Sequence, residues 1–175
     1  HGIMMICDEV QCGGARSGKM FASQYFKDAG CAPDIMSTAK SIAGGMPLSA
    51  VTARAEIMDA VPGGTIGGTY GANAVSAASA LAVIDVMTRD DYPAKAMHIA
   101  DVVGKRFNAW KDKYECVGDV RGTGAMIGIE FVKDKATKEP DAALVGAIVQ
   151  EAMNNGLMLE SAGTYGNVIR FLCPL

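Results

Sequence analysis

The sequence predicts a layered α/β unit followed by a smaller α+β unit. Residues 2–7 form a continuous apolar run that leads into Asp8 and Glu9, which is typical of a strand buried on both faces of a parallel sheet. Residues 73–88 are rich in alanine and contain neither glycine nor proline, which predicts a helix. Beyond these helical residues the texture of the sequence changes, so we assign residues 1–87 to the first unit and 88–175 to the second.

The other elements follow from apolar periodicity and from the glycines and prolines that interrupt it. We expect further helices at residues 21–29, 56–61, 93–114 and 142–155, and further strands at residues 35–38, 49–52, 126–132, 157–160 and 168–172. Residues 12–18, 65–70 and 134–140 are predicted to be loops, and residues 117–124 a turn-rich segment.

Composition and charge exclude several classes of partner. The 175 residues are 50% apolar and 20% charged, with a net charge of −3. Because no basic stripe interrupts the chain, neither nucleic acid nor an anionic membrane surface is an expected partner. No apolar run approaches the roughly 18 residues that cross a bilayer.

The cysteines favour a protein of the cytoplasm. All five are scattered along the chain, none forms a CxxC pair, and only two histidines accompany them. A metal site is therefore not expected, and the simplest interpretation is a set of reduced thiols in a cytoplasmic protein.

Lys40 and Asp8 are the first candidates for chemistry, because each follows a predicted strand. Small and apolar residues surround Lys40, and desolvation there would favour the neutral amine that a Schiff base requires. Asp8 stands where open α/β sheets place their ligands, and its carboxylate is suited to a protonated ring nitrogen. A surface lysine and a helix-capping or loop carboxylate remain the alternatives, and Glu9 is expected to point elsewhere.

Two further segments could bind anions. The loop residues Gly67, Gly68 and Thr69 offer backbone N–H groups and a hydroxyl, which suit a phosphate, although a tight turn would have the same sequence. Arg170 stands among apolar residues of the last predicted strand. If it is buried, its guanidinium needs an anion, either a substrate carboxylate or a structural ion-pair partner.

Taken in order, five segments of the chain resemble the class III (ω-) aminotransferases, and within that class the 4-aminobutyrate aminotransferases. The segments are DEVQCGGARSG (8–18), APDIMSTAKSIAGGMPLSAV (32–51), GGTYGAN (67–73), GDVRGTGAMIGIEF (118–131) and NVIRFLCPL (167–175). The resemblance implies part of the large domain of fold type I pyridoxal-phosphate-dependent transferases, which has a mixed, mainly parallel sheet. A small α+β domain, truncated at its end, would follow it.

The resemblance also implies a role for each candidate residue near the cofactor ring. Lys40 matches the lysine that holds pyridoxal 5'-phosphate as a Schiff base and later moves a proton. Asp8 matches the acid that keeps the pyridine nitrogen protonated, so that the ring acts as an electron sink. Gln11 matches a glutamine near the phenolic oxygen of the cofactor.

Other matched residues imply partners. Thr69, with Gly68 beside it, matches a threonine that reaches the cofactor phosphate of the neighbouring subunit, which implies a homodimer with a shared active site. Arg170 matches the arginine that binds a substrate carboxylate. Together these matches imply transfer of an amino group from an ω-amino acid to 2-oxoglutarate. An ornithine- or acetylornithine-type aminotransferase, a glutamate-semialdehyde aminomutase and a non-catalytic dimerisation remnant are the alternatives.

Two departures and one absence qualify the resemblance. Ala15 stands where the family loop has glycine, which requires a negative φ there, and Ser49 stands where alanine or glycine is more common. The chain opens on His1 rather than methionine and stops at Leu175, each beside an apolar run. The family's other phosphate loop and its ring-stacking aromatic have no counterpart here. We therefore expect a fragment that is inactive by itself.

Overall fold

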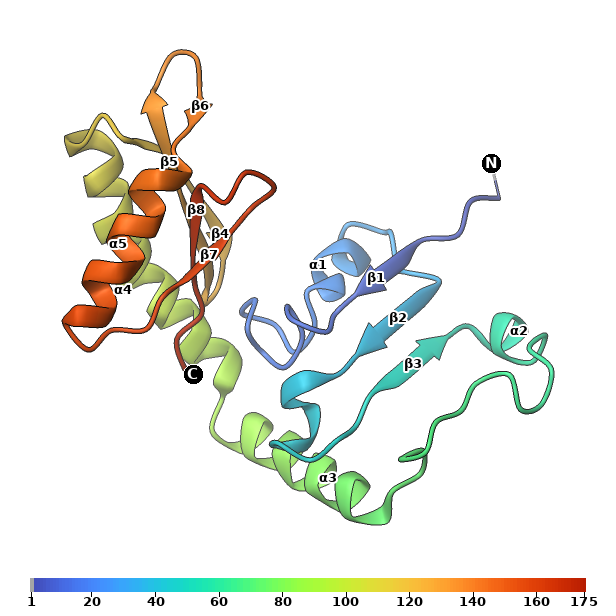
Figure 1. Ribbon diagram of the computed structural model, residues 1–175. Helices are drawn as coiled ribbons and strands as arrows, with labels where there is room; N and C mark the ends of the chain where they lie inside the picture. Colours follow the sequence, from blue (N-terminus) through green and yellow to red (C-terminus); the bar gives the residue numbers. More distant parts are fainter. Residues whose placement is uncertain (1) are drawn as a thin grey trace. The chain divides into compact units, whose positions relative to one another are not determined.

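The computed structural model describes residues 2–175, so His1 lies outside the described part. The chain divides into two compact units, one ending at Pro93 and the other beginning at Ala94. Figure 1 shows the helices and strands of both units. Within residues 2–175, no helix has both the length and the apolar character needed to span a membrane.

The first unit is built on a mixed, three-stranded sheet in the order β1-β2-β3. Its strands are β1 (Ile6–Asp8), β2 (Ile35–Thr38) and β3 (Ala50–Ala53). β1 and β2 run parallel, with Asp8 opposite Ser37, whereas β2 and β3 run antiparallel. The carboxyl ends of β1 and β2 therefore meet at the same edge of the sheet.

Short helices and one long helix complete this unit. They are α1 (Ser23–Asp28), the 3-10 turn η1 (Lys40–Ala43), α2 (Ala55–Met58) and α3 (Ala74–Arg89). The helix predicted at 73–88 is confirmed to within one residue at each end. It begins where the Asn73 side chain accepts hydrogen bonds from the backbone N–H groups of Val75 and Ser76, at 3.0 and 3.1 Å.

The second unit is an antiparallel sheet covered by two helices. Its main strands lie in the order β4-β5-β8-β7, with β6 paired to β5. The elements are α4 (Tyr92–Lys113), β4 (Val117–Thr123), β5 (Met126–Asp134), β6 (Glu139–Pro140), α5 (Ala142–Asn154), β7 (Glu160–Ala162) and β8 (Val168–Phe171). α4 starts just before the division between the units and otherwise belongs to the second. The mixed first sheet followed by this α+β unit agrees with the predicted fold class.

One hydrophobic core joins both helices of the second unit to the sheet. Its buried members are Phe107, Val117, Ile127, Ile129, Phe131, Val145 and Ile169. The Phe107 ring from α4 meets the Phe171 ring edge-on, with 5.7 Å between the ring centres. Because side chains alternate along a strand, the neighbours of these residues point to the opposite face of the sheet.

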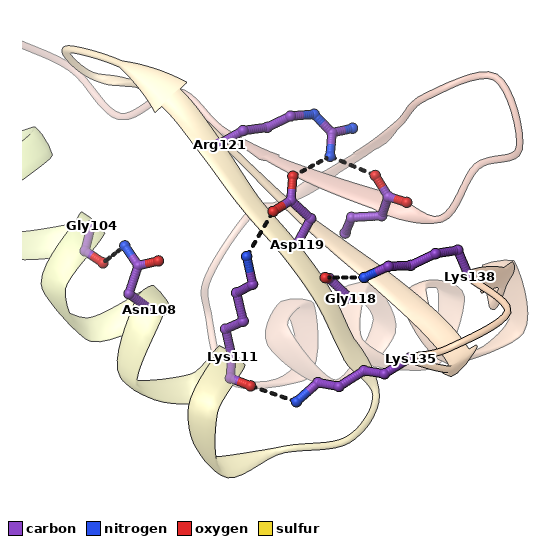
Figure 2. A network of polar contacts seen from close by, with 9 residues as sticks. Gly104, Asn108, Lys111, Gly118, Asp119, Arg121, Lys135 and Lys138 are labelled. Carbon is purple, nitrogen blue, oxygen red and sulfur yellow. Dashed lines mark hydrogen bonds and ion pairs between the residues drawn. The ribbon is translucent and has the colours of Figure 1, made fainter.

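A network of polar contacts fixes the carboxyl end of α4 to β4 and β5 (Figure 2). The Asp119 carboxylate accepts hydrogen bonds from the Lys111 side chain at 2.9 Å and from Arg121 at 3.2 Å. The hydrogen bond from Lys111 is the main reason why the pKa of Asp119 is lowered. Lys135 and Lys138 donate to the backbone carbonyl oxygens of Lys111 and Gly118, at 2.7 and 2.8 Å. Both lysines thus satisfy carbonyl groups at the junction between helix and sheet.

The predicted strand at residues 2–7 is wrong in its extent and in its burial. β1 begins only at Ile6, and the side chains of Ile3 and Ile6 are 83% and 66% exposed. The physical reason is that the described residues 2–175 place no covering layer over these side chains. An apolar run indicates that a strand can be buried, but burial also requires a covering layer.

Three predictions in the second unit also need correction. Residues 117–124 were expected to form turns because of their glycines, but residues 117–123 form β4, with Arg121 opposite Gly128 on β5. The strand expected at 157–160 lies instead at residues 160–162, after the exposed Leu157 and Met158. The expected surface loop at 134–140 contains the short strand β6. In each of these segments, pairing with a neighbouring strand determines the secondary structure, and local composition does not.

Candidate active site

Asp8 and Lys40 lie at the carboxyl ends of adjacent parallel strands. Asp8 is the last residue of β1 and stands opposite Ser37 on β2, and Lys40 follows the end of β2 by two residues. Open α/β sheets bind their ligands at this edge. The structure therefore brings these two predicted residues to one edge of the first sheet.

The backbone at Lys40 is unusual for a residue that is not glycine. Its φ is +55°, in the left-handed region, and the preceding Ala39 is extended. Such a conformation costs free energy and clusters at functional sites, where the surrounding structure imposes it. The side chain of Lys40 leaves the sheet edge at the first residue of η1.

Contacts with α3 hold η1 in place. The Ser79 hydroxyl on α3 donates a hydrogen bond of 2.8 Å to the carbonyl oxygen of Ala43, the buried last residue of η1. Gly44 then ends the turn at φ +56°, and a Cβ there would lie 3.1 Å from the Val83 side chain. The alanine-rich helix thus supports the turn that carries Lys40.

The apolar surroundings predicted for Lys40 are not present among residues 2–175. Its side chain is exposed, and its nitrogen makes no hydrogen bond or ion pair with any other described residue. The small residues that follow it, from Ser41 to Gly44, form η1 and its end, and they pack toward α3 instead of around the lysine. The amine is therefore accessible at the sheet edge.

The Asp8 carboxylate is exposed at the same edge and is partly oriented by its neighbours. Its Oδ1 accepts a hydrogen bond of 3.0 Å from the backbone N–H of Val10 and one of 3.4 Å from the Ser37 hydroxyl. The register between β1 and β2 places Ser37 beside Asp8, so the sequence alone could not identify this serine. The second carboxylate oxygen remains able to accept a hydrogen bond from a ligand.

Glu9 points away from Asp8, as predicted, and it is buried. Its carboxylate accepts hydrogen bonds from the backbone N–H groups of Ala22 at 3.1 Å and Ser23 at 2.5 Å, and from the Cys12 thiol at 2.9 Å. Burial by itself would raise the pKa of Glu9, but these hydrogen bonds outweigh it and leave the pKa below its ordinary value. Glu9 therefore stays ionised inside the protein.

The Cys12 thiol should be almost unreactive in the folded protein. Burial and the hydrogen bond to the Glu9 carboxylate raise the pKa of Cys12 to about 12. Since the thiolate is the nucleophile, we expect alkylation of Cys12 near pH 8 to be about a thousandfold slower than that of an ordinary thiol. Mass spectrometry of iodoacetamide-treated protein measures the rate, and the exposed Cys31 serves as the internal reference. Equal rates at both cysteines would contradict the predicted shift.

The loop after Glu9 carries Gln11 and Ala15. Gln11 is partly buried, and it lies between two residues whose side chains are fixed, Glu9 and Cys12. Ala15 contradicts the expectation of a negative φ, since its φ is +68° and its side chain is fully buried. Two backbone hydrogen bonds hold this conformation: the Ala15 N–H donates to the Met20 carbonyl oxygen at 3.1 Å, and the Gly18 N–H donates to the Ala15 carbonyl oxygen at 2.9 Å.

Gly68 and Thr69 lie in an exposed loop of the first unit. The Gly71 N–H donates a hydrogen bond of 2.9 Å to the carbonyl oxygen of Gly68, so this part of the loop is a turn. Apart from the residues adjacent in sequence, no atom of residues 2–175 lies within 4 Å of the Cβ position of Gly67 or Gly68. The backbone there is open to an approaching group.

Arg170 lies on β8 in the second unit and is not fully buried. Its side chain is 31% exposed and forms an ion pair with Glu160, the residue opposite it on β7. Because Ile169 packs into the hydrophobic core, alternation along the strand directs Arg170 to the other face of the sheet. The ion pair that the sequence left open as an alternative is thus formed.

The fold is that of the corresponding part of pyridoxal-phosphate-dependent aminotransferases. Two solved structures match 99% of the chain with a TM-score of 0.87: a Bacillus anthracis aminotransferase at 30% identity and an amine transaminase from an uncultivated Pseudomonas species at 34%. The second was solved with pyridoxal phosphate bound as the internal aldimine. The chain covers 41% and 40% of these two proteins.

More specifically, the chain belongs to the class-III aminotransferases, whose sequence profile matches residues 1–175. It is 46% identical over 175 residues to the 4-aminobutyrate aminotransferase GabT of Escherichia coli, and 42% identical over 175 residues to a probable 4-aminobutyrate aminotransferase of Bacillus subtilis. It is 47% identical over 179 residues to the 5-aminovalerate aminotransferase DavT of Pseudomonas putida. In all three comparisons the whole chain is covered, but it spans only 39–40% of the relative.

Proposed function

We propose that the full-length protein transfers the amino group of 4-aminobutyrate to 2-oxoglutarate and so forms succinate semialdehyde. One observation carries this proposal: Asp8 and Lys40 stand at the carboxyl ends of adjacent parallel strands. A carboxylate and a primary amine at one sheet edge are the groups that this cofactor needs at its ring nitrogen and its carbonyl carbon. Identities of 42–46% to 4-aminobutyrate aminotransferases support the choice of substrate.

Pyridoxal phosphate, when bound, supplies an electron sink for the negative charge that develops at the substrate carbon bearing the amino group. In this proposal the Lys40 amine would hold the cofactor through its carbonyl carbon, with the carbonyl oxygen leaving as water, and would later carry a proton to and from the substrate. The second carboxylate oxygen of Asp8 would accept a hydrogen bond from the protonated ring nitrogen. Gln11 would donate to the phenolic oxygen.

We also propose that two copies of the protein share each active site. Thr69, with the open backbone of Gly68 beside it, would bind the cofactor phosphate of the partner subunit. Residues 65–69 are exposed, which supports a role in contact with another chain. Residues 1–87 would then belong to the cofactor-binding domain and residues 88–175 to the small domain.

The comparisons favour one second candidate function, the transamination of 5-aminovalerate, because a 5-aminovalerate aminotransferase is among the relatives at 47% identity. The two donors differ by one methylene group, which enzymes distinguish by about 10–200-fold. Measuring kcat/KM of the full-length protein with both donors and 2-oxoglutarate decides between them. A higher value with ornithine than with either donor would contradict both proposals.

Arg170 is the proposed binding site for a substrate carboxylate. We expect Arg170→Ala to raise KM for 2-oxoglutarate by about 10–100-fold, since a charge-assisted hydrogen bond contributes about 1.5–3 kcal/mol. Arg170→Lys should recover only part of the loss, because an ammonium group cannot bind a carboxylate through two parallel hydrogen bonds. Steady-state kinetics with varied 2-oxoglutarate measure the effect.

Arg121 offers a matched control for Arg170. It lies on β4 of the same sheet and, like Arg170, pairs with a glutamate of the neighbouring strand. Arg121→Ala should therefore leave KM for 2-oxoglutarate within about twofold, although it removes an arginine from the same sheet. Equal increases in KM for both alanine variants would contradict the assignment of Arg170.

The 175 residues alone are proposed to be inactive and the whole enzyme to be cytoplasmic. Two observations support the inactivity. Lys40 is exposed, and the chain spans only 39–40% of the length of the 4-aminobutyrate aminotransferases that it matches. The cytoplasmic location is supported by the cysteines, which form no disulfide within residues 2–175. Among residues 2–175, no three His, Cys, Asp or Glu side chains are grouped closely enough to hold a metal ion.

A further inference from the structure

Glu9 has no role in the proposed reaction, yet several hydrogen bonds hold its carboxylate. It is 2% exposed, and its carboxylate has three hydrogen-bond donors. A buried carboxylate is costly unless its charge is compensated, and backbone N–H groups together with a thiol compensate it here. Such an arrangement joins three separate segments through one side chain.

The first two segments are the end of β1 and the start of α1. α1 begins without a capping side chain of its own, since Ala22 occupies the position before its first residue. The Glu9 carboxylate replaces that cap from thirteen and fourteen residues away, through the N–H groups of Ala22 and Ser23. The loop from Val10 to Phe21 is therefore closed at its base.

The third segment is the loop itself. The Cys12 thiol donates to the Glu9 carboxylate, and the Gly13 N–H donates to the Glu9 carbonyl oxygen at 3.0 Å. A Cβ at Gly13 would lie 2.6 Å from that oxygen, so this turn requires glycine. Gln11 lies between these fixed points and has little freedom to move.

The backbone of Glu9 is fixed as well, and this fixes Asp8. The Glu9 N–H donates a hydrogen bond of 2.9 Å to the carbonyl oxygen of Ser37 on β2. Glu9 directly follows β1. Since consecutive side chains of extended backbone point to opposite faces, anchoring Glu9 on the buried side directs Asp8 to the exposed side. The orientations of Asp8 and Gln11 are thus both tied to Glu9.

We propose that Glu9 is a positioning residue, whose ionised carboxylate holds Asp8 and Gln11 in the geometry that the cofactor requires. This inference rests on the proposed function, in which those two residues contact pyridoxal phosphate. Glu9 itself does not touch the cofactor. A displacement of about 1 Å at a reacting group can lower a rate a hundredfold, so the support of these side chains matters for catalysis.

The conservative variant Glu9→Gln tests the inference in the full-length protein. The amide keeps the size of the side chain but places an NH2 group against the Ala22 N–H and removes the charge. Hydrogen exchange at the amides of Ala22 and Ser23 should become faster, and so should alkylation of Cys12. The dissociation constant of pyridoxal phosphate should rise about tenfold or more, and kcat should fall by about 10–100-fold with a smaller change in KM.

Asp141→Asn is the matched control. Asp141 caps α5 in the second unit through a hydrogen bond of 2.9 Å from the Leu144 N–H, so this variant also replaces a capping carboxylate by its amide. It should lower the melting temperature without changing cofactor affinity or kcat. If Glu9→Gln behaves like Asp141→Asn in these two measurements, Glu9 is only a structural residue and the inference is wrong.

Misfolding of the Glu9→Gln variant and failure of the proposed function can both be distinguished from failure of this inference. If Glu9→Gln does not fold, Cys12→Ala removes one donor to the same carboxylate, and a smaller loss of cofactor affinity is expected. An unchanged affinity would then contradict the inference. Failure of the unmodified full-length protein to bind pyridoxal phosphate at Lys40 would instead overturn the proposed function itself, and with it the inference.

Discussion

Replacing Lys40 by alanine in the full-length protein is expected to lower kcat by at least about a thousandfold, because the lysine would carry both the cofactor and the transferred proton. The visible absorbance that the cofactor acquires on binding to the lysine should disappear as well. Stopped-flow or steady-state assays measure the rate, and a spectrum of the dialysed protein measures the bound cofactor.

Lys19→Ala provides the control for this experiment. Lys19 also belongs to the first unit, where it forms an ion pair with Asp28 on the surface and has no part in the proposed site. Its replacement should leave both the spectrum and kcat within about twofold of the unmodified protein. A Lys40→Ala variant that keeps full activity would contradict the role of this lysine, whatever the structure of the site.

A single methyl group on Gly122 should destabilise the second unit strongly. A Cβ at this position would lie 2.2 Å from the Met126 carbonyl oxygen and 2.8 Å from the Ile127 Cα, and both belong to the backbone of the paired strand. Neither atom can move without disturbing the register between β4 and β5. We expect Gly122→Ala to lower the free energy of unfolding by about 2–3 kcal/mol, measured by urea denaturation followed by circular dichroism.

Gly128→Ala tests whether the effect depends on the site. Gly128 lies on the paired strand β5, but the nearest atom to its Cβ position is in the Val168 side chain at 3.4 Å, an ordinary contact. This substitution should change the free energy of unfolding by less than about 1 kcal/mol. Similar losses for both glycines would show that the close approach at Gly122 is not the cause.

Some strands could be predicted from the sequence and others could not. The strand at residues 35–38 was predicted correctly, and with it the position of Lys40 at a strand end. The prediction for residues 117–124 was wrong because glycine was taken as a sign of a turn. Gly122 instead marks the close approach of two strands. Pairing partners far apart in the sequence determined this strand, and no local pattern contained them.

The hydrogen bonds around Asp8 are a second feature that could not be predicted from the sequence. Ser37 and Glu9 fix that part of the site through the register of β1 and β2 and through a hydrogen-bonded loop, neither of which is visible in spacing alone. One local signal did exist. α1 begins after Ala22, with no capping side chain of its own, which indicates that an acceptor must come from elsewhere. Lys40 shows a further limit. It is exposed although small and apolar residues adjoin it in the sequence, so sequence neighbours do not determine whether a lysine is buried.

The most direct test of the central claim is chemical trapping of the cofactor on the full-length protein. The protein is incubated with pyridoxal phosphate, reduced with borohydride, digested and analysed by mass spectrometry, so that any lysine bound to the cofactor keeps it as a stable adduct. We predict the adduct on Lys40 and on no other lysine. An adduct confined to other lysines, with Lys40 unmodified, would contradict the account.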